Sequence, residues 1–60
     1  MDILKATEHA QALYNAHGDK AEYEAARRQK QSEEAGDSYE AKNWKSIRAA
    51  VRRLRGPIQS

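Results

Sequence analysis

Apolar residues recur at helical spacing in two stretches, one at each end of the chain. The first stretch carries, three or four residues apart, Ile3, Ala6, Ala10, Leu13 and His17, with Leu4 and Tyr14 beside them. The last stretch carries Trp44, Ile47, Val51 and Leu54 at the same spacing, followed by Ile58. Residues three or four apart share one face of an α-helix. Both ends of the chain are therefore predicted to be amphipathic helices.

The middle of the chain has a different pattern, because no apolar side chain larger than alanine lies between Tyr23 and Tyr39. Its candidate contact face is small and consists of Ala21, Ala25, Ser32 and Ala35, with the stem of Arg28 among them. Small side chains let two helix backbones approach closely, so this face can pack against the bulkier helices. The rest of the middle segment is charged, and Glu24 and Arg28 are spaced to pair along a helix.

Two Gly-Asp pairs divide the chain, and a glutamate follows each aspartate by three residues. The pairs are Gly18-Asp19, followed by Glu22, and Gly36-Asp37, followed by Glu40. Glycine suits the end of a helix because it accepts a positive φ. Aspartate suits the N-cap, and a glutamate three residues later completes a capping box. The pattern predicts that one helix ends and the next begins at each pair.

These helix start and stop signals predict an all-α fold with helices at about 2–17, 20–35 and 38–55. Short links turn successive helices back on one another, which favours a compact antiparallel three-helix bundle. If one Gly-Asp pair is absorbed into a long bent helix, the alternative is a two-helix hairpin. Gly56-Pro57 marks a third stop, since proline cannot continue a helix, and residues 56–60 are expected to form an irregular tail.

The supply of large apolar side chains is small. The chain has 60 residues, and 11 of its hydrophobic residues are alanines; only 12 apolar side chains are larger. We expect one small domain spanning residues 1–60, and a domain of this size buries only about 60% of the surface of its unfolded chain. A single copy should therefore be marginally stable, and contact with a partner or a second copy would stabilise it.

Charge is divided unevenly along the chain. Residues 1–40 hold 5 basic and 9 acidic residues, whereas residues 41–60 hold 6 basic residues and none that is acidic. The third helix therefore offers a candidate partner-binding surface, with apolar anchors Trp44, Ile47, Val51 and Leu54 and a basic rim of Lys45, Arg48, Arg52 and Arg55. An acidic protein, the phosphates of a nucleic acid or an anionic membrane could meet such a rim. Alternatively, the rim is simply solvated or is neutralised by the acidic first 40 residues, and Trp44 fills the core.

Several classes of chemistry find no support in the sequence. The chain has no cysteine for a disulfide or a thiolate zinc site, and His9 and His17 are too far apart to form a helical pair of metal ligands. No serine lies in a nucleophile-elbow pattern, and no glycine-rich loop could hold a phosphate. We expect no enzymatic activity, cofactor, metal or small-molecule substrate.

No apolar run approaches the roughly 18 residues of a membrane span, and no signal-peptide pattern is present, which favours the cytoplasm.

The chain resembles a group of short bacterial all-helical proteins. The residues that carry the resemblance are, in order, Leu13-Tyr14, His17-Gly18-Asp19, Ala35-Gly36-Asp37, Trp44, Ile47-Arg48-Ala49-Ala50 and Arg55-Gly56-Pro57. The resemblance implies an all-helical fold, and it carries over no functional residue because no activity is known for that group. Gly36-Asp37 with Ala41 and Trp44 is also similar to part of a tetratricopeptide repeat, but the interval between turns is 18 residues rather than the 34 of that repeat.

These observations favour one functional hypothesis. We expect a non-catalytic helical protein–protein interaction module that forms a homodimer or serves as a small subunit of a complex. The alternative is a nucleic-acid-binding accessory protein that uses the basic face of the third helix.

Overall fold

The computed structural model describes residues 2–56, which form three α-helices. Helix α1 spans Ile3–His17, α2 spans Ala21–Glu34 and α3 spans Ser38–Arg55, and a 3₁₀ turn over Gly18–Lys20 joins α1 to α2. No strand occurs within the described residues. The all-α prediction is confirmed, and every helix begins and ends within one residue of its predicted boundary. Pro57 and Ile58, and most of the predicted tail, lie outside the described residues.

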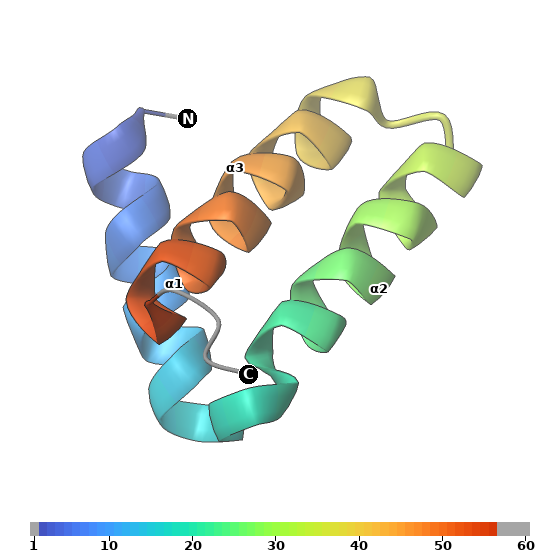
Figure 1. The fold of residues 1–60 in the computed structure, drawn as a ribbon. Helices are drawn as coiled ribbons and strands as arrows, with labels where there is room; N and C mark the ends of the chain where they lie inside the picture. The colour runs from blue at the N-terminus through green and yellow to red at the C-terminus, as the bar shows by residue number, and fades with distance from the viewer. Residues whose placement is uncertain (1, 57–60) are drawn as a thin grey trace.

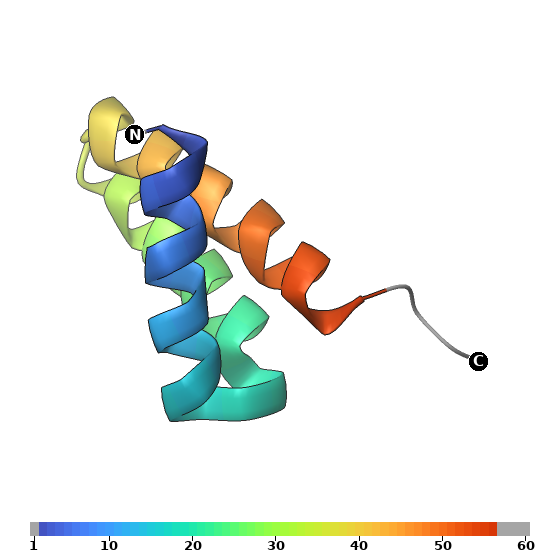
Figure 2. The same cartoon turned by 90° about the vertical axis from the view of Figure 1, so that its left-hand side faces the viewer.

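Helix α3 is the centre of the fold. It lies beside α2 and runs antiparallel to it (Figure 1), and it crosses α1 obliquely (Figure 2). Helices α1 and α2 contact each other much less than either contacts α3. The two-helix alternative is wrong, because the chain changes direction at Gly18, whose φ of +60° ends α1.

The core consists mainly of alanine side chains around two larger residues of α3. Ile47 and Val51 are the largest fully buried side chains, and they are surrounded by Ala6, Ala10, Ala21, Ala25 and Ala50. Leu13, Tyr14, Trp44 and Leu54 are partly buried at its edge. The small contact face predicted for α2 is confirmed at Ala21 and Ala25, and it ends before Ala35, which is exposed.

Four large apolar side chains of the described residues remain outside this core. They are Ile3, Leu4, Tyr23 and Tyr39, which are 70%, 68%, 67% and 70% exposed. The prediction that Ile3 belongs to the buried stripe of α1 is wrong. Because α1 crosses α3 obliquely, the two helices meet at Ala6 and Ala10, and the first turn of α1 extends past the closest contact.

The ends of the helices follow the signals predicted at Gly18, Gly36, Asp37 and Gly56, and one cap, at Asp2, was not predicted. Asp2 caps α1, where its carboxylate accepts a hydrogen bond from the backbone N–H of Lys5 at 2.8 Å. Asp37 caps α3 in the same way, and Gly56, with φ +78°, ends α3. The exception is Asp19, which lies inside the 3₁₀ turn and does not cap α2, so its predicted capping role is wrong.

Candidate functional site

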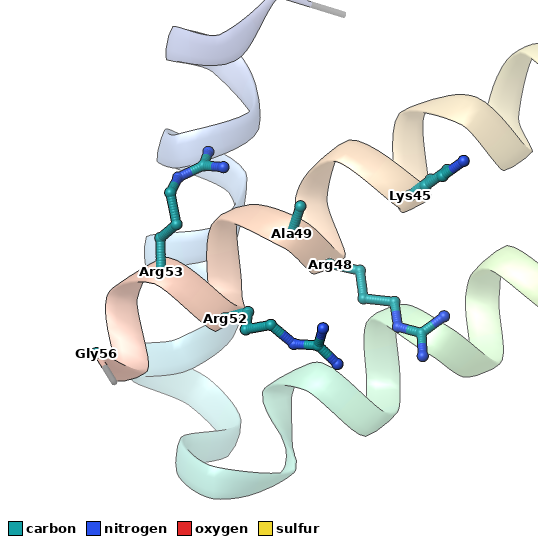
Figure 3. A pocket seen from close by; sticks show the side chains of 6 residues that line it. All are labelled: Lys45, Arg48, Ala49, Arg52, Arg53 and Gly56. Carbon is teal, nitrogen blue, oxygen red and sulfur yellow. The ribbon is translucent and has the colours of Figure 1, made fainter. Parts of the chain in front are cut away.

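The outer side of α3 carries a concentrated set of cations. Six residues line a shallow depression on this helix, and we call them the cationic face: Lys45, Arg48, Ala49, Arg52, Arg53 and Gly56. Figure 3 shows Arg48 and Arg52 extending over α2, whereas Arg53 extends toward the opposite side of α3. Ala49 lies between these side chains, so the centre of the face is small and open to approach.

The cationic face matches the predicted basic rim in three of its four residues. Lys45, Arg48 and Arg52 lie on it, but Arg55 turns toward α2. Arg53 takes its place, although the sequence reasoning left it out of the rim. The helical position of Arg53 could have identified it. Arg53 follows Ile47 by six residues and Val51 by two, and this spacing places it on the side of α3 opposite the buried stripe.

Glu22 on α2 neutralises part of the predicted rim. Its carboxylate accepts hydrogen bonds from Arg52 at 2.8 Å and from Arg55 at 2.6 Å, while its side chain is only 16% exposed. Partial burial acts to raise the pKa of Glu22, but the hydrogen bonds and charges of Arg52 and then Arg55 outweigh it, so the pKa lies below its ordinary value. The acidic first part of the chain therefore does pair with two of the four rim residues.

The remaining rim residues have no acidic partner. Arg48 donates to the side-chain oxygen of Gln29 at 3.4 Å, which leaves its charge uncompensated. Lys45 and Arg53 form no ion pair with any of the described residues. The cationic face therefore keeps a positive charge that is available to another molecule.

The four predicted apolar anchors divide into two pairs. Ile47 and Val51 are fully buried within the chain, so no partner can reach them while the helices stay packed. Trp44 and Leu54 are half-buried and keep some accessible surface. The sequence could not separate the two pairs, because all four share one stripe and only the crossing of α1 over α3 decides which of them are covered.

Trp44 is held between two polar side chains from the other helices. The ring of His9 stacks on it with ring centroids 5.9 Å apart and the planes 13° from parallel. The guanidinium of Arg28 lies 5.4 Å from the centroid of the Trp44 ring, a cation–π arrangement. These three residues line a hollow of about 220 Å³ together with Ala12, Leu13 and Ala16. Trp44 therefore joins all three helices rather than serving only as core or only as surface.

A second groove connects the cationic face to an exposed apolar side chain. It lies between α1 and α3 and is lined by Ile3, Ala6, Ser46, Ala49 and Arg53. Ala49 and Arg53 belong to both the groove and the cationic face. The exposed Ile3 thus forms an apolar edge beside the cations, an arrangement in which a partner could meet both kinds of group at once.

No family model, curated protein or solved structure matches this chain. The resemblance to short bacterial helical proteins therefore stays a prediction. Within residues 2–56, no helix is both long enough and apolar enough to cross a membrane, and no three His, Asp or Glu side chains are grouped so that they could hold a metal ion.

Proposed function

We propose that this chain is a non-catalytic protein–protein interaction module of the cytoplasm: a compact three-helix bundle that works as a homodimer or as a small subunit of a complex. The observation that carries the proposal is the distribution of large apolar side chains. Among the large apolar side chains of residues 2–56, only Ile47 and Val51 are fully buried, whereas Ile3, Leu4, Tyr23 and Tyr39 are each at least two-thirds exposed.

This distribution favours association because burial of large apolar side chains is the main favourable term in folding and binding. Each such side chain contributes roughly 1.5–3 kcal/mol when it is fully buried, and the four exposed ones contribute little of this in a single copy. A partner that covers them would add the missing burial. The cationic face and the edge formed by Ile3 suit this role, since protein interfaces commonly combine an apolar centre with a polar rim.

Sedimentation velocity of the purified chain, from about 1 µM to about 1 mM, tests the proposal directly. We expect the average mass to rise with concentration, or a stable dimer to be present at every concentration. A single species with the mass of one chain over the whole range would contradict self-association. In that case the small-subunit form of the proposal predicts that the chain co-purifies with one partner at fixed stoichiometry from its native source.

A nucleic-acid-binding accessory function is the second candidate, and the cationic face favours it. Arginine side chains pair with phosphates through two parallel hydrogen bonds, and Arg48, Arg52 and Arg53 line one depression on α3. Fluorescence anisotropy with labelled DNA and RNA at low salt is the test. Binding that weakens steeply with added salt and with Arg53→Gln supports this function, because phosphate contacts release counterions. No binding at micromolar protein contradicts it.

A further inference from the structure

An acidic surface surrounds the turn between α2 and α3. We call it the acidic turn, and it consists of the exposed residues Glu33, Glu34, Asp37, Tyr39 and Glu40. The ion pairs of residues 2–56 use only the carboxylates of Glu22 and Glu24, so none of those in the acidic turn meets a cation. Its carboxylates therefore form no ion pair within the described chain, and the nearest cations, Lys42 and Lys45, line a hollow beside Glu33.

The acidic turn makes only neutral or backbone hydrogen bonds. Glu33 accepts from the side-chain amide of Gln29 at 3.1 Å, and Glu40 accepts from that of Asn43 at 3.5 Å. Asp37 accepts from the backbone N–H of Glu40 at 3.0 Å. These contacts hold the carboxylates in place without neutralising them. Tyr39 lies among them with 70% of its surface exposed, which gives the acidic turn an apolar centre.

The cationic face is the counterpart of this surface. It presents four cations, Lys45, Arg48, Arg52 and Arg53, around Ala49, with the exposed Ile3 at its edge. The acidic turn presents four carboxylates around Tyr39. Each surface thus has an apolar centre and unpaired charges of one sign: four carboxylates on the acidic turn, and Lys45, Arg48 and Arg53 on the cationic face, where Arg52 is already paired with Glu22.

The acidic turn cannot fold onto the cationic face of its own chain. Glu40 lies in the first turn of α3 and Arg53 in the last, and at 1.5 Å per residue the helix separates them by about 20 Å, more than twice the Debye length of about 8 Å at physiological salt. The arginine end of the cationic face therefore barely interacts with the acidic turn of its own copy, whereas Lys45, which lines a hollow with Glu33, lies next to it. The helix holds the arginine end and the acidic turn apart rigidly (Figure 1), and both remain open to a second molecule.

We propose that the acidic turn of one copy docks on the cationic face of another, with Tyr39 against Ile3 and Ala49. This inference rests on the proposed function and names the partner as a second copy of this chain. Complementary charge supports it, because both halves of the contact are present on every copy. Since the two halves are different surfaces, the contact is head-to-tail, and it leaves one free half on each terminal copy.

Salt is the first test of this contact. Sedimentation of the wild-type chain at low and at high salt should show an association that weakens at least tenfold as salt rises, because added ions screen exposed charges. Association that is unchanged or stronger at high salt would overturn the proposal. It would indicate that apolar side chains alone hold the copies together.

Two charge-reversal variants locate the contact. The acidic-turn variant combines Glu33→Lys with Glu34→Lys, and the cationic-face variant combines Lys45→Glu with Arg53→Glu. All four residues are exposed and outside the ion pairs and helix caps, so the fold should survive, as circular dichroism will show. Each variant alone should lose self-association at least tenfold. An equimolar mixture should associate again, because the unaltered acidic turn of the cationic-face variant can dock on the unaltered cationic face of the acidic-turn variant.

Lys5→Glu combined with Lys20→Glu is the matched control. Both residues are exposed and lie outside the two surfaces, and this variant changes the net charge by the same amount as the cationic-face variant. It should associate like the wild type. If it loses association equally, net charge and not the cationic face is responsible, and the proposal fails.

The outcomes separate this inference from the proposed function. If the wild-type chain associates but the two charge-reversal variants do so equally well, or if their mixture stays monomeric, the head-to-tail contact is wrong while self-association stands. If the wild-type chain is monomeric at all concentrations, this inference and the homodimer form of the proposed function are both overturned, and only the small-subunit form of the proposed function stands.

Discussion

The two Gly-Asp turns have the same sequence pattern and different structures. Each has glycine, aspartate and, three residues later, glutamate, and in both the glycine adopts a positive φ, +60° at Gly18 and +76° at Gly36. At the second turn Asp37 caps α3 as predicted, but the predicted capping box is incomplete, because the N–H of Asp37 donates to the carbonyl of Ser32 and the carboxylate of Glu40 accepts from Asn43. At the first turn the glycine ends α1 as predicted, but Asp19 does not cap α2, and Glu22 forms ion pairs with two arginines of α3.

At the second turn the hydrogen bonds are local. The N–H of Gly36 donates to the carbonyl of Glu33 at 3.1 Å, and the N–H of Asp37 donates to that of Ser32 at 2.9 Å, which satisfies the end of α2. Asp37 has φ −96° and ψ 84°, outside the helical region, and its carboxylate accepts from Glu40. An N-cap residue requires such a non-helical backbone.

At the first turn the backbone never leaves the helical region after Gly18. Lys20 precedes α2 with φ −88° and ψ 0°, so no residue has the extended conformation of an N-cap. Asp19 lies within the 3₁₀ turn, and Glu22 pairs with Arg52 and Arg55, 30 and 33 residues away. The comparison shows that the two turns differ in the aspartate, which caps a helix only at Asp37, and that neither Glu22 nor Glu40 completes its predicted capping box.

The largest expected difference between the turns concerns the glycines. Gly18 combines φ +60° with ψ −129°, a region that side chains rarely enter, so Gly18→Ala should cost about 2–3 kcal/mol. Gly36→Ala should cost about 1 kcal/mol, because a positive φ at a helix end is less strained for alanine. Nothing lies within 4 Å of a Cβ added at either position, so backbone strain alone is measured. Urea unfolding of both variants is the measurement.

Synthetic chains with D-alanine at these positions give the control, since a D-residue favours positive φ. They should be more stable than the L-alanine variants at both turns, because the D-residue adopts the positive φ without strain. Equal losses for L- and D-alanine would mean that the glycine conformations are not those of the structure.

The stability losses of the two aspartate variants should differ by less than those of the two glycine variants. Asp37→Ala removes the cap of α3 and should cost about 1 kcal/mol, whereas Asp19→Ala removes no cap and should change stability by only a few tenths. Thermal unfolding followed by circular dichroism compares the two variants. If Asp19→Ala is as damaging as Asp37→Ala, the first turn has the capped structure that its sequence predicted.

The glutamates should show the smallest effect and a pH dependence. Glu22→Gln should cost about 0.5–1 kcal/mol, because Arg52 is largely exposed and surface ion pairs are weak. The pKa of Glu22 is lowered in the folded chain, so this stabilisation is present above the unfolded pKa of about 4.3 and is lost as pH falls through the folded pKa.

The measurement is the unfolding free energy of wild type and Glu22→Gln at several pH values. The difference between them should be largest near neutral pH and shrink below the unfolded pKa. Glu40→Gln is the comparison variant, since Glu40 has no ion pair among the described residues. A difference for Glu22→Gln that stays constant down to strongly acidic pH would contradict the ion pairs with Arg52 and Arg55.

The sequence predicted those features that depend on neighbouring residues. The helix boundaries were right within one residue, because capping aspartates and positive-φ glycines act over three or four positions. The position of Ile3, the burial of Ile47 and Val51, and the exchange of Arg55 for Arg53 on the cationic face all depend on how α1 and α2 lie on α3. Helical periodicity gives the direction of a side chain but not where a neighbouring helix ends.

The central claim is that a chain with so few large side chains in its core gains stability from contact with another copy. The thermal midpoint measured by circular dichroism over a hundredfold range of protein concentration tests it most directly. The account predicts a midpoint that rises steadily with concentration, because association stabilises the folded state by mass action. A cooperative transition at one unchanged midpoint, from a chain that stays monomeric throughout, would contradict the claim.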